Sequence, residues 1–267
     1  MELQTHKIIS IVNQKGGVGK TTTALNMSAW LSLFTKAKVL LIDMDGQANL
    51  TACVNIDKSK VKGNSFDLLV NEELKAEDII YKDKSLLFDM IVADEKLNNI
   101  DLILNNVMDR ERQLSYKLEE IKEKYDFIII DCSPSLNLAT INSLATTDFI
   151  MIPVQADYLS VRGTAKLLES INKVKAKINP GLDILGVFLT MYDNRKLNDK
   201  EIYDTIQEQF KEKAFKTCIR ENVRLKESPI ERKSIFEYDK SCNGFYDYYS
   251  LMVEVWKRLG GNVSEKR

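Results

Sequence analysis

An apolar run, a glycine-rich loop and a helical pattern follow one another without a gap, and this succession constrains the fold more than any other feature. The run KIISIV (7–12) is rich in isoleucine, the loop NQKGGVGKTT occupies 13–22, and apolar residues then recur at a helical period of about 3.6 residues, at Ala24, Met27, Leu31 and Phe34. A loop in this setting can direct backbone N–H groups at phosphate oxygens from the positive end of a helix. The segment therefore predicts a phosphate-binding loop within an α/β fold.

The loop departs from the usual GxxxxGK[ST] pattern, because that pattern would place its first glycine at Gln14. Gly19, Lys20 and Thr21 satisfy the end of the pattern, and Lys15 is an additional lysine. We expect Lys20 to contact the β and γ phosphates and the Thr21 hydroxyl to bind Mg²⁺. A glycine-rich turn without a ligand is the alternative, and the flanking strand and helix disfavour it.

Further apolar runs recur along the chain with helical segments between them. Their hydrophobicity is continuous rather than alternating, which indicates strands that helices cover on both faces. We therefore predict an α/β fold with a single doubly wound, mostly parallel sheet flanked by helices. The expected strands after the first are 38–43, 100–104, 126–131, 148–154 and 183–191.

Helical patterns at 109–124 and 160–178 are expected to lie on the surface of this sheet. The region 54–99 is the least regular, with short helical patterns at 65–70 and 76–80, and we interpret it as an insertion. No linker-like stretch flanks it, so the prediction is one domain over 1–267. The ends, 1–6 and 262–267, are expected to be flexible.

Composition narrows the range of partners and locations. The formal net charge is -1, so no global basic field indicates a nucleic-acid partner. The four cysteines form no CxxC pair and the chain begins without a long apolar signal core, which predicts a reduced, cytoplasmic protein. No apolar run approaches the ~20 residues of a membrane span. A single histidine, His6, excludes a histidine-based metal site.

A last amphipathic helix is expected at 242–259, where its apolar face could pack on the domain or lie on a membrane. Its polar face is as acidic as it is basic, whereas a membrane-surface helix would be rich in lysine and arginine there. We therefore expect packing against the domain and no membrane partner.

Three aspartates end predicted strands, where ligands of open α/β sheets bind. LLIDMDG carries Asp43 and Asp45, and DFIIIDCSPS carries Asp131. A carboxylate after a buried apolar run is costly unless it is hydrogen-bonded, solvated or near a metal. Asp131 is expected to hold Mg²⁺, directly or through water. A helix cap or turn residue is the alternative for each aspartate.

Six segments of the chain resemble those of one protein family. The segments KGGVGKTT, DMDGQANLT, IIIDCSPSL, IPVQADYLSVRG, FLTMYDNR and NVRLKESP, in this order, are similar to those of ParA/Soj-type ATPases, the deviant Walker A group of P-loop NTPases that also includes MinD. The resemblance extends from about residue 7 to 257. Because no separate DNA-binding domain precedes the loop, the chain resembles the short Soj-like branch.

The resemblance implies a chromosome or plasmid partition ATPase. ATP with Mg²⁺ would drive a face-to-face homodimer, the dimer would bind nonspecific DNA of the nucleoid in the cytoplasm, and a ParB-type protein would stimulate hydrolysis. Lys15, Lys20 and Asp45 would be catalytic, with Lys15 reaching the phosphate held by the opposite subunit and Asp45 associated with the attacking water. Nucleotide contacts would come from Lys15, Gly16, Gly17, Val18, Gly19, Lys20, Thr21, Thr22, Asn222 and Pro229.

Two departures from the family pattern affect this expectation. The proline common after the second aspartate is replaced by Gly46, which predicts a more flexible segment. The IPRNVRL pattern near the nucleotide base is CIRENVRL here, so Arg220 replaces a proline and Glu221 an arginine. Base contacts in that segment are often made by the backbone, so ATP remains the expected nucleotide.

Nonspecific DNA binding needs basic residues that collect phosphates. Glu227 and Glu231 interrupt the basic cluster, so an ordinary solvated face is an open alternative. The DNA-binding residues that we expect are Arg195, Arg224, Lys226, Arg232 and Lys233, of which Arg195 and Arg224 match family positions.

Two other functions share the loop. A MinD-like membrane-positioning ATPase would need a basic amphipathic tail, which the chain lacks. An iron protein of the nitrogenase type would hold a cluster between two subunits with two cysteines from each. Cys132 and Cys53 are the cysteines considered as cluster ligands. We expect both to be small buried residues instead.

Overall fold

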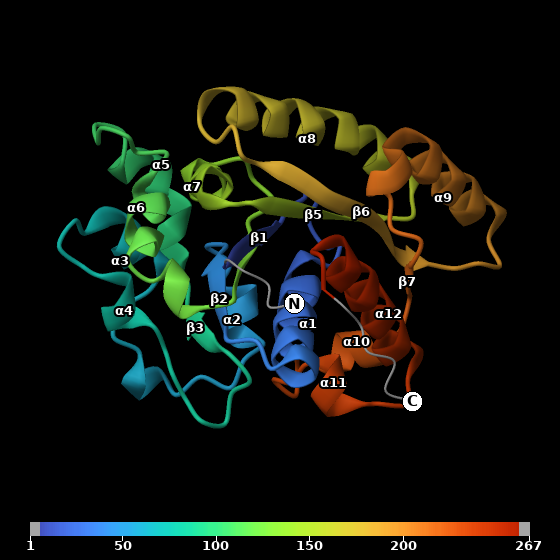
Figure 1. Cartoon of the computed structure of the whole chain (residues 1–267), viewed down its shortest axis with the longest axis horizontal. Coiled ribbons are helices and arrows are strands. Elements are labelled where there is room, and N and C mark those ends of the chain that lie inside the picture. The colour runs from blue at the N-terminus through green and yellow to red at the C-terminus, as the bar shows by residue number, and fades with distance from the viewer. Residues whose placement is uncertain (1–5, 262–267) are drawn as a thin grey trace.

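The structure is a computed structural model that describes residues 6–261. The expected flexible ends therefore lie outside the described residues, apart from His6. The described chain forms a seven-stranded parallel sheet in the order β3-β2-β4-β1-β5-β6-β7, which confirms the predicted α/β class (Figure 1). The strands are β1 Lys7–Ile11, β2 Val39–Met44, β3 Asp89–Ile91, β4 Phe127–Cys132, β5 Phe149–Gln155, β6 Asp183–Tyr192 and β7 Ile219–Arg220.

Helices cover both faces of the sheet (Figure 1). As a result, adjacent residues of β1 are buried on opposite faces of the sheet, Ile8 in one hydrophobic cluster and Ile9 in the other. The continuous hydrophobicity of the strands therefore reflects burial on both sides. The helices are α1 Lys20–Trp30, α2 Asn49–Ala52, α3 Ser65–Val70, α4 Ala76–Ile79, α5 Ile100–Ile103, α6 Gln113–Glu119, α7 Leu138–Thr146, α8 Tyr158–Lys177, α9 Leu197–Phe210, α10 Val223–Glu227, α11 Ile235–Tyr238 and α12 Asn243–Arg258.

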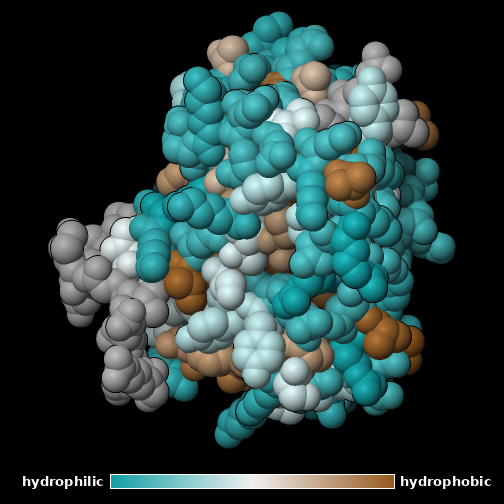
Figure 2. Space-filling view, turned by 90° about the vertical axis from the view of Figure 1, so that its right-hand side faces the viewer, coloured by the Kyte–Doolittle hydropathy of each residue, from teal (hydrophilic) through white to brown (hydrophobic). Residues whose placement is uncertain are grey.

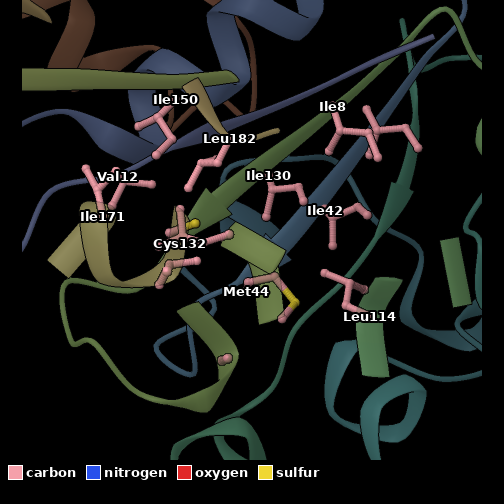
Figure 3. Packing of buried hydrophobic residues seen from close by; sticks show 14 of the residues in the cluster. Ile8, Val12, Ile42, Met44, Leu114, Ile130, Cys132, Ile150, Ile171 and Leu182 are labelled. Carbon is pink, nitrogen blue, oxygen red and sulfur yellow. The ribbon is translucent and has the colours of Figure 1, made fainter. Parts of the chain in front are cut away.

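One cluster lies between the sheet and the α3, α6, α7, α8 and α9 side of the molecule (Figure 3). In that view Ile42 and Met44 of β2 approach Ile130 and Cys132 of β4, with Leu114 of α6 nearby. The other cluster is formed with α1, α11 and α12. The two clusters thus bury the central strands from both sides.

The central helix α1 is buried on almost every side, rather than along one stripe. Ala24, Met27 and Leu31 are buried as expected, whereas Phe34 is 45% exposed and packs edge-on against the ring of Tyr249. The reason is that α12 covers the side of α1 that faces away from the sheet. Packing of the last helix on the domain is thus confirmed.

The prediction of a strand at 100–104 is wrong, because these residues form α5 and the turn after it. Leu97, Ile100 and Leu104 are buried at helical spacing. The two edge strands, β3 and β7, were not predicted, and β3 lies inside the region interpreted as an insertion. The long helix predicted at 109–124 is shorter, since α6 covers only Gln113–Glu119.

Among the described residues, no helix is long and apolar enough to cross a membrane. Figure 2 shows the α9 and α12 side of the molecule as mainly hydrophilic, with its hydrophobic side chains in separate patches.

Candidate nucleotide-binding and catalytic site

The glycine loop follows β1, at the centre of the sheet, and leads directly into α1. Gly17 and Gly19 have φ values of 75° and 90°, in the left-handed region where a side chain would be strained. The space beside Gly16 and Gly17 is open, with no atom within 4 Å of a built Cβ. The loop thus has both the backbone freedom and the room that a phosphate cradle requires.

Two polar residues that the sequence did not single out hold the loop in shape. The Asn13 side chain donates to the Pro153 carbonyl at 2.7 Å and accepts from the Lys15 N–H at 2.9 Å. The Thr190 hydroxyl donates to the Val18 carbonyl at 2.9 Å. Pro153 and Thr190 come from β5 and β6, so the neighbouring strands support the loop. The only signal for Asn13 in the sequence was its position as the polar residue that ends the apolar run 7–12.

The two lysines of the loop point to different places. The Lys20 ammonium lies inside the loop and donates to the Lys15 carbonyl at 3.0 Å. Burial lowers the pKa of Lys20, against the opposing influence of Asp131. A desolvated ammonium among backbone groups is well placed to receive a phosphate.

The Lys15 ammonium is held outside the loop by the segment that leads into α8. It lies 2.6 Å from Asp157, 2.9 Å from the Gln155 amide oxygen and 3.0 Å from the Ser160 hydroxyl. Burial would raise the pKa of Asp157, but the hydrogen bonds from Lys15 and Ser160 hold it below its ordinary value. The Lys15 side chain remains 40% exposed, so solvent reaches this ion pair.

Thr21 and Asp131 meet at the first turn of α1. The Thr21 hydroxyl donates to Oδ2 of Asp131 at 2.7 Å, and parallel pairing places Asp131 opposite both Ile11 and Asp43. Burial first, and then the nearby Asp43, raises the pKa of Asp131 well above its ordinary range. Its other oxygen, Oδ1, is buried without a hydrogen-bond partner among the described residues.

The unpaired Oδ1 of Asp131 indicates whether a cation would fit this site. A buried carboxylate oxygen without a donor is costly, and a cation or its bound water would remove that cost. A hydroxyl and a carboxylate beside a phosphate loop are also oxygen ligands of the kind that Mg²⁺ prefers. Thr21 and Asp131 therefore fit Mg²⁺.

The two aspartates at the end of β2 have different environments. Asp43 is fully buried and accepts from the Thr51 N–H at 2.9 Å, the Thr51 hydroxyl at 2.8 Å and the Asp45 N–H at 3.1 Å. Burial raises the pKa of Asp43 to about 6. Among the described residues, the Asp45 carboxylate accepts only from the Gln47 N–H, at 3.0 Å. Asp43 is thus the structural anchor, and Asp45 retains capacity for a further donor.

A small cavity of about 90 Å³ lies between the start of α1 and the segment after β7. Asn222 lines this cavity together with Thr22 and Gly19, whereas Pro229, the other nucleotide contact predicted in this part of the chain, is not among its lining residues. Arg220, which replaces the family proline, lines the same cavity. Its guanidinium contacts the carboxylate of Asp247 on α12 at 2.6 Å, which ties β7 to α12.

Three of the five basic residues expected to bind DNA have carboxylate partners. Arg195 pairs with Asp193 at 2.8 Å, Arg224 with Glu227 at 2.7 Å, and Lys226 with Glu221 at 2.9 Å. Their charge is therefore locally balanced. Arg232 and Lys233 are exposed and have no ion pair with any other described residue.

The cysteine environments bear on the iron-protein alternative. Cys132 lies in the buried cluster of Figure 3, and burial raises its pKa to about 12. Burial likewise raises the pKa of Cys53 to about 11. Cluster ligands are thiolates, and these environments disfavour the thiolate form.

Comparison with known proteins agrees with this geometry. Residues 6–184 match the family model described as an AAA domain. A putative plasmid partition protein from Borrelia burgdorferi bound to AMPPNP superimposes with a TM-score of 0.78 at 26% identity, covering 95% of this chain and 99% of that chain. Cobyrinic acid a,c-diamide synthase from Mycobacterium smegmatis, with bound ADP and magnesium, gives a TM-score of 0.79 at 25% identity over 94% and 96% of the two chains. Fold and site together define a P-loop ATPase.

Relatives found by sequence identify the family within the P-loop ATPases. The sporulation initiation inhibitor protein Soj of Bacillus subtilis is 41% identical over 249 residues, which cover 93% of this chain and 98% of Soj. The chain belongs to the ParA/Soj family of chromosome and plasmid partition ATPases. The resemblance found in the motifs is thereby confirmed.

Proposed function

We propose that this protein is a Mg²⁺-dependent ATPase whose ATP-bound form is a face-to-face dimer that binds nonspecific DNA. Hydrolysis, stimulated by a ParB-type partner, then releases the DNA. The chain would act as one domain, in the cytoplasm and on the nucleoid. Family membership supports the partition role, and relatives of the same fold with bound nucleotide and magnesium support ATP and Mg²⁺ as the ligands.

The observation that carries this proposal is the divergence of the two loop lysines. Lys20 occupies its own phosphate loop, whereas Lys15 is turned outward onto Asp157. Exposed ion pairs of this kind contribute only about 0–1 kcal/mol, so a triphosphate on a second subunit could displace Asp157. In a dimer the outward Lys15 could reach the phosphate of the facing subunit, whereas within one subunit it makes only the partly exposed contacts with Asp157, Gln155 and Ser160.

Each residue of the site has a role in the proposed reaction. Lys20 and the loop amides bind and orient the phosphates, and Thr21 with Asp131 would hold Mg²⁺. Magnesium, when bound, neutralises charge on the β and γ phosphates. Asp45 would orient the attacking water through a hydrogen bond, and Lys15 of the facing subunit would stabilise negative charge in the transition state.

DNA binding would be a property of the dimer. In one subunit the carboxylate partners of Arg195, Arg224 and Lys226 must be displaced by phosphates, which keeps the affinity of a monomer low. Two linked copies would raise the effective concentration of the same weak surface. We therefore expect binding only in the ATP state, with Arg232 and Lys233 as additional phosphate contacts.

Retardation of random-sequence DNA, together with the mass in solution measured by light scattering, tests the proposal. We expect a dimer and DNA binding with ATP but not with ADP, and neither in Lys20→Ala. Lys15→Ala should bind ATP but remain monomeric or fail to hydrolyse it, while the exposed Lys177→Ala should behave as the parent protein. DNA binding that ignores the nucleotide would refute the mechanism. Pelleting with liposomes in ATP would favour the MinD-like alternative.

A further inference from the structure

A short helical segment bridges two loops of the catalytic edge. It consists of a 3₁₀ turn, η3 (Glu95–Asn99), continued by α5. The Asp94 side chain accepts from the Lys96 N–H at 2.9 Å and so caps its start. Leu97, Ile100 and Leu104 fix the segment in the core, where each is at most 2% exposed.

One side of this segment contacts the loop that carries Asp45. The Asn98 amide donates to the Gly46 carbonyl at 3.3 Å. A Cβ built on Gly46 would lie 2.3 Å from Oδ1 of Asn98 and 2.9 Å from its backbone nitrogen. The φ of Gly46 is not in the left-handed region, so the close approach of Asn98, and not backbone freedom, requires a glycine here. Close packing against Asn98 is therefore a structural reason for a glycine at position 46, beside the flexibility that the sequence predicts there.

The same segment contacts the helix that begins after the Asp131 loop. Oδ1 of Asp101 accepts from the Leu138 N–H, at the start of α7, at 3.1 Å. The Thr140 hydroxyl of α7 in turn donates to the carbonyl of Ser135, within the loop that follows Asp131, at 2.7 Å. A carboxylate at a helix N-terminus is favourable both as a hydrogen-bond acceptor and through the helix dipole.

Asn98 and Asp101 are three residues apart, the spacing that places two side chains on one face of a helix. We propose that η3 and α5 form a strut between the two catalytic loops, with Asn98 and Asp101 as positioning residues that set Asp45 relative to Asp131. The inference rests on the proposed function, because that function assigns Asp45 to the attacking water and Asp131 to Mg²⁺. Among the described residues, neither Asn98 nor Asp101 has a hydrogen bond to the phosphate loop, to Thr21 or to Asp131, so loss of the strut should affect turnover more than ATP binding.

The first test compares kinetic constants of single variants. Asn98→Ala should lower kcat for ATP hydrolysis about fivefold, the equivalent of one neutral hydrogen bond, with the Kd for ATP unchanged. Asp101→Ala should act in the same direction, and Asp101→Asn should restore turnover because an amide oxygen still accepts from Leu138. The matched control is Asn99→Ala, an exposed neighbour whose side chain caps nothing.

The second test does not depend on activity. Hydrogen exchange followed by mass spectrometry should show faster exchange of the amides at 45–48 in Asn98→Ala and at 133–138 in Asp101→Ala, but not in Asn99→Ala. Equal effects of Asn98→Ala and Asn99→Ala on kcat and on exchange would overturn the strut. If Asp45→Ala hydrolyses ATP normally, the proposed role of Asp45 fails, while the exchange experiment still decides whether the strut holds the loop.

Discussion

Replacing Thr51 with valine should destabilise the protein more at pH 8 than at pH 5. The Thr51 hydroxyl donates to the carboxylate of Asp43 at 2.8 Å and accepts from the Ala93 N–H at 3.0 Å. Valine has nearly the same shape but no hydroxyl, so Asp43 loses a donor and a largely buried N–H loses its acceptor. The change thus removes two interactions and creates little empty volume.

The magnitude follows from these two losses. A hydrogen bond to a charged group contributes about 1.5–3 kcal/mol, and an unsatisfied buried donor costs about 1–3 kcal/mol. Allowing for overlap, we expect a loss of about 3 kcal/mol at pH 8. At pH 5 most of the Asp43 carboxyl is protonated, because its pKa is about 6, and the loss should fall to about 1–2 kcal/mol.

The direction of the pH dependence is set by the raised pKa of Asp43. Its pKa in the folded protein is about 6 against an ordinary value of 3.8, so the folded state binds this proton more tightly and loses stability as the pH rises from about 4 through 6. The Thr51 hydrogen bonds hold this pKa down. Valine should therefore raise it further and extend the loss of stability to higher pH.

Urea unfolding followed by circular dichroism at both pH values measures the difference by linear extrapolation. Thr205→Val is the matched control, because the exposed Thr205 hydroxyl bonds only the Glu201 carbonyl of its own helix among the described residues. It should change the free energy of unfolding little, and equally at both pH values. A destabilisation by Thr51→Val that is the same at pH 5 and pH 8, or larger at pH 5, would refute the reasoning.

Three other changes have defined outcomes. Thr21→Val should abolish Mg²⁺-dependent hydrolysis while Tm changes by only a few degrees, because it removes the bond to Asp131 and the proposed Mg²⁺ ligand; near-normal turnover would contradict that role. Gly186→Ala should lower the free energy of unfolding by about 1–3 kcal/mol, since its Cβ would lie 2.3 Å from the ring of Phe215, and an unchanged Tm would contradict this packing. Cys132, whose pKa burial raises to about 12, should react with iodoacetamide at pH 8 only after unfolding, as peptide mass spectrometry can show.

Most of the fold could be predicted because the central strands are long apolar runs buried on both faces. The runs that became β1, β2, β4, β5 and β6 were located to within a residue or two. The edge strands β3 and β7 were missed because they have only three and two residues. The partner of β3, β2, also lies about fifty residues earlier in the chain. IDLIL was misassigned because a short apolar run does not distinguish a strand from a buried helical turn.

The residues that gather at the candidate site could also be predicted from the sequence, because they lie in one continuous loop and at strand ends. Gly19, Lys20 and Thr21 follow one another along the chain, and the apolar run before Asp131 already indicated that its carboxylate would lie at the end of a strand. Pairing of β4 with β1 then brought Thr21 and Asp131 together, as expected.

Only the tertiary structure decided how the loops around that chemistry are held. Asp157 lies 142 residues from Lys15 along the chain, and they meet because β5 pairs with β1. Asn98 and Gly46 are 52 residues apart along the chain. They meet because β3, which precedes Asn98, pairs with β2, which precedes Gly46. Local sequence determines which groups are available for catalysis. Which of them touch depends on strand order and on helix packing, which emerge only when the whole chain has folded.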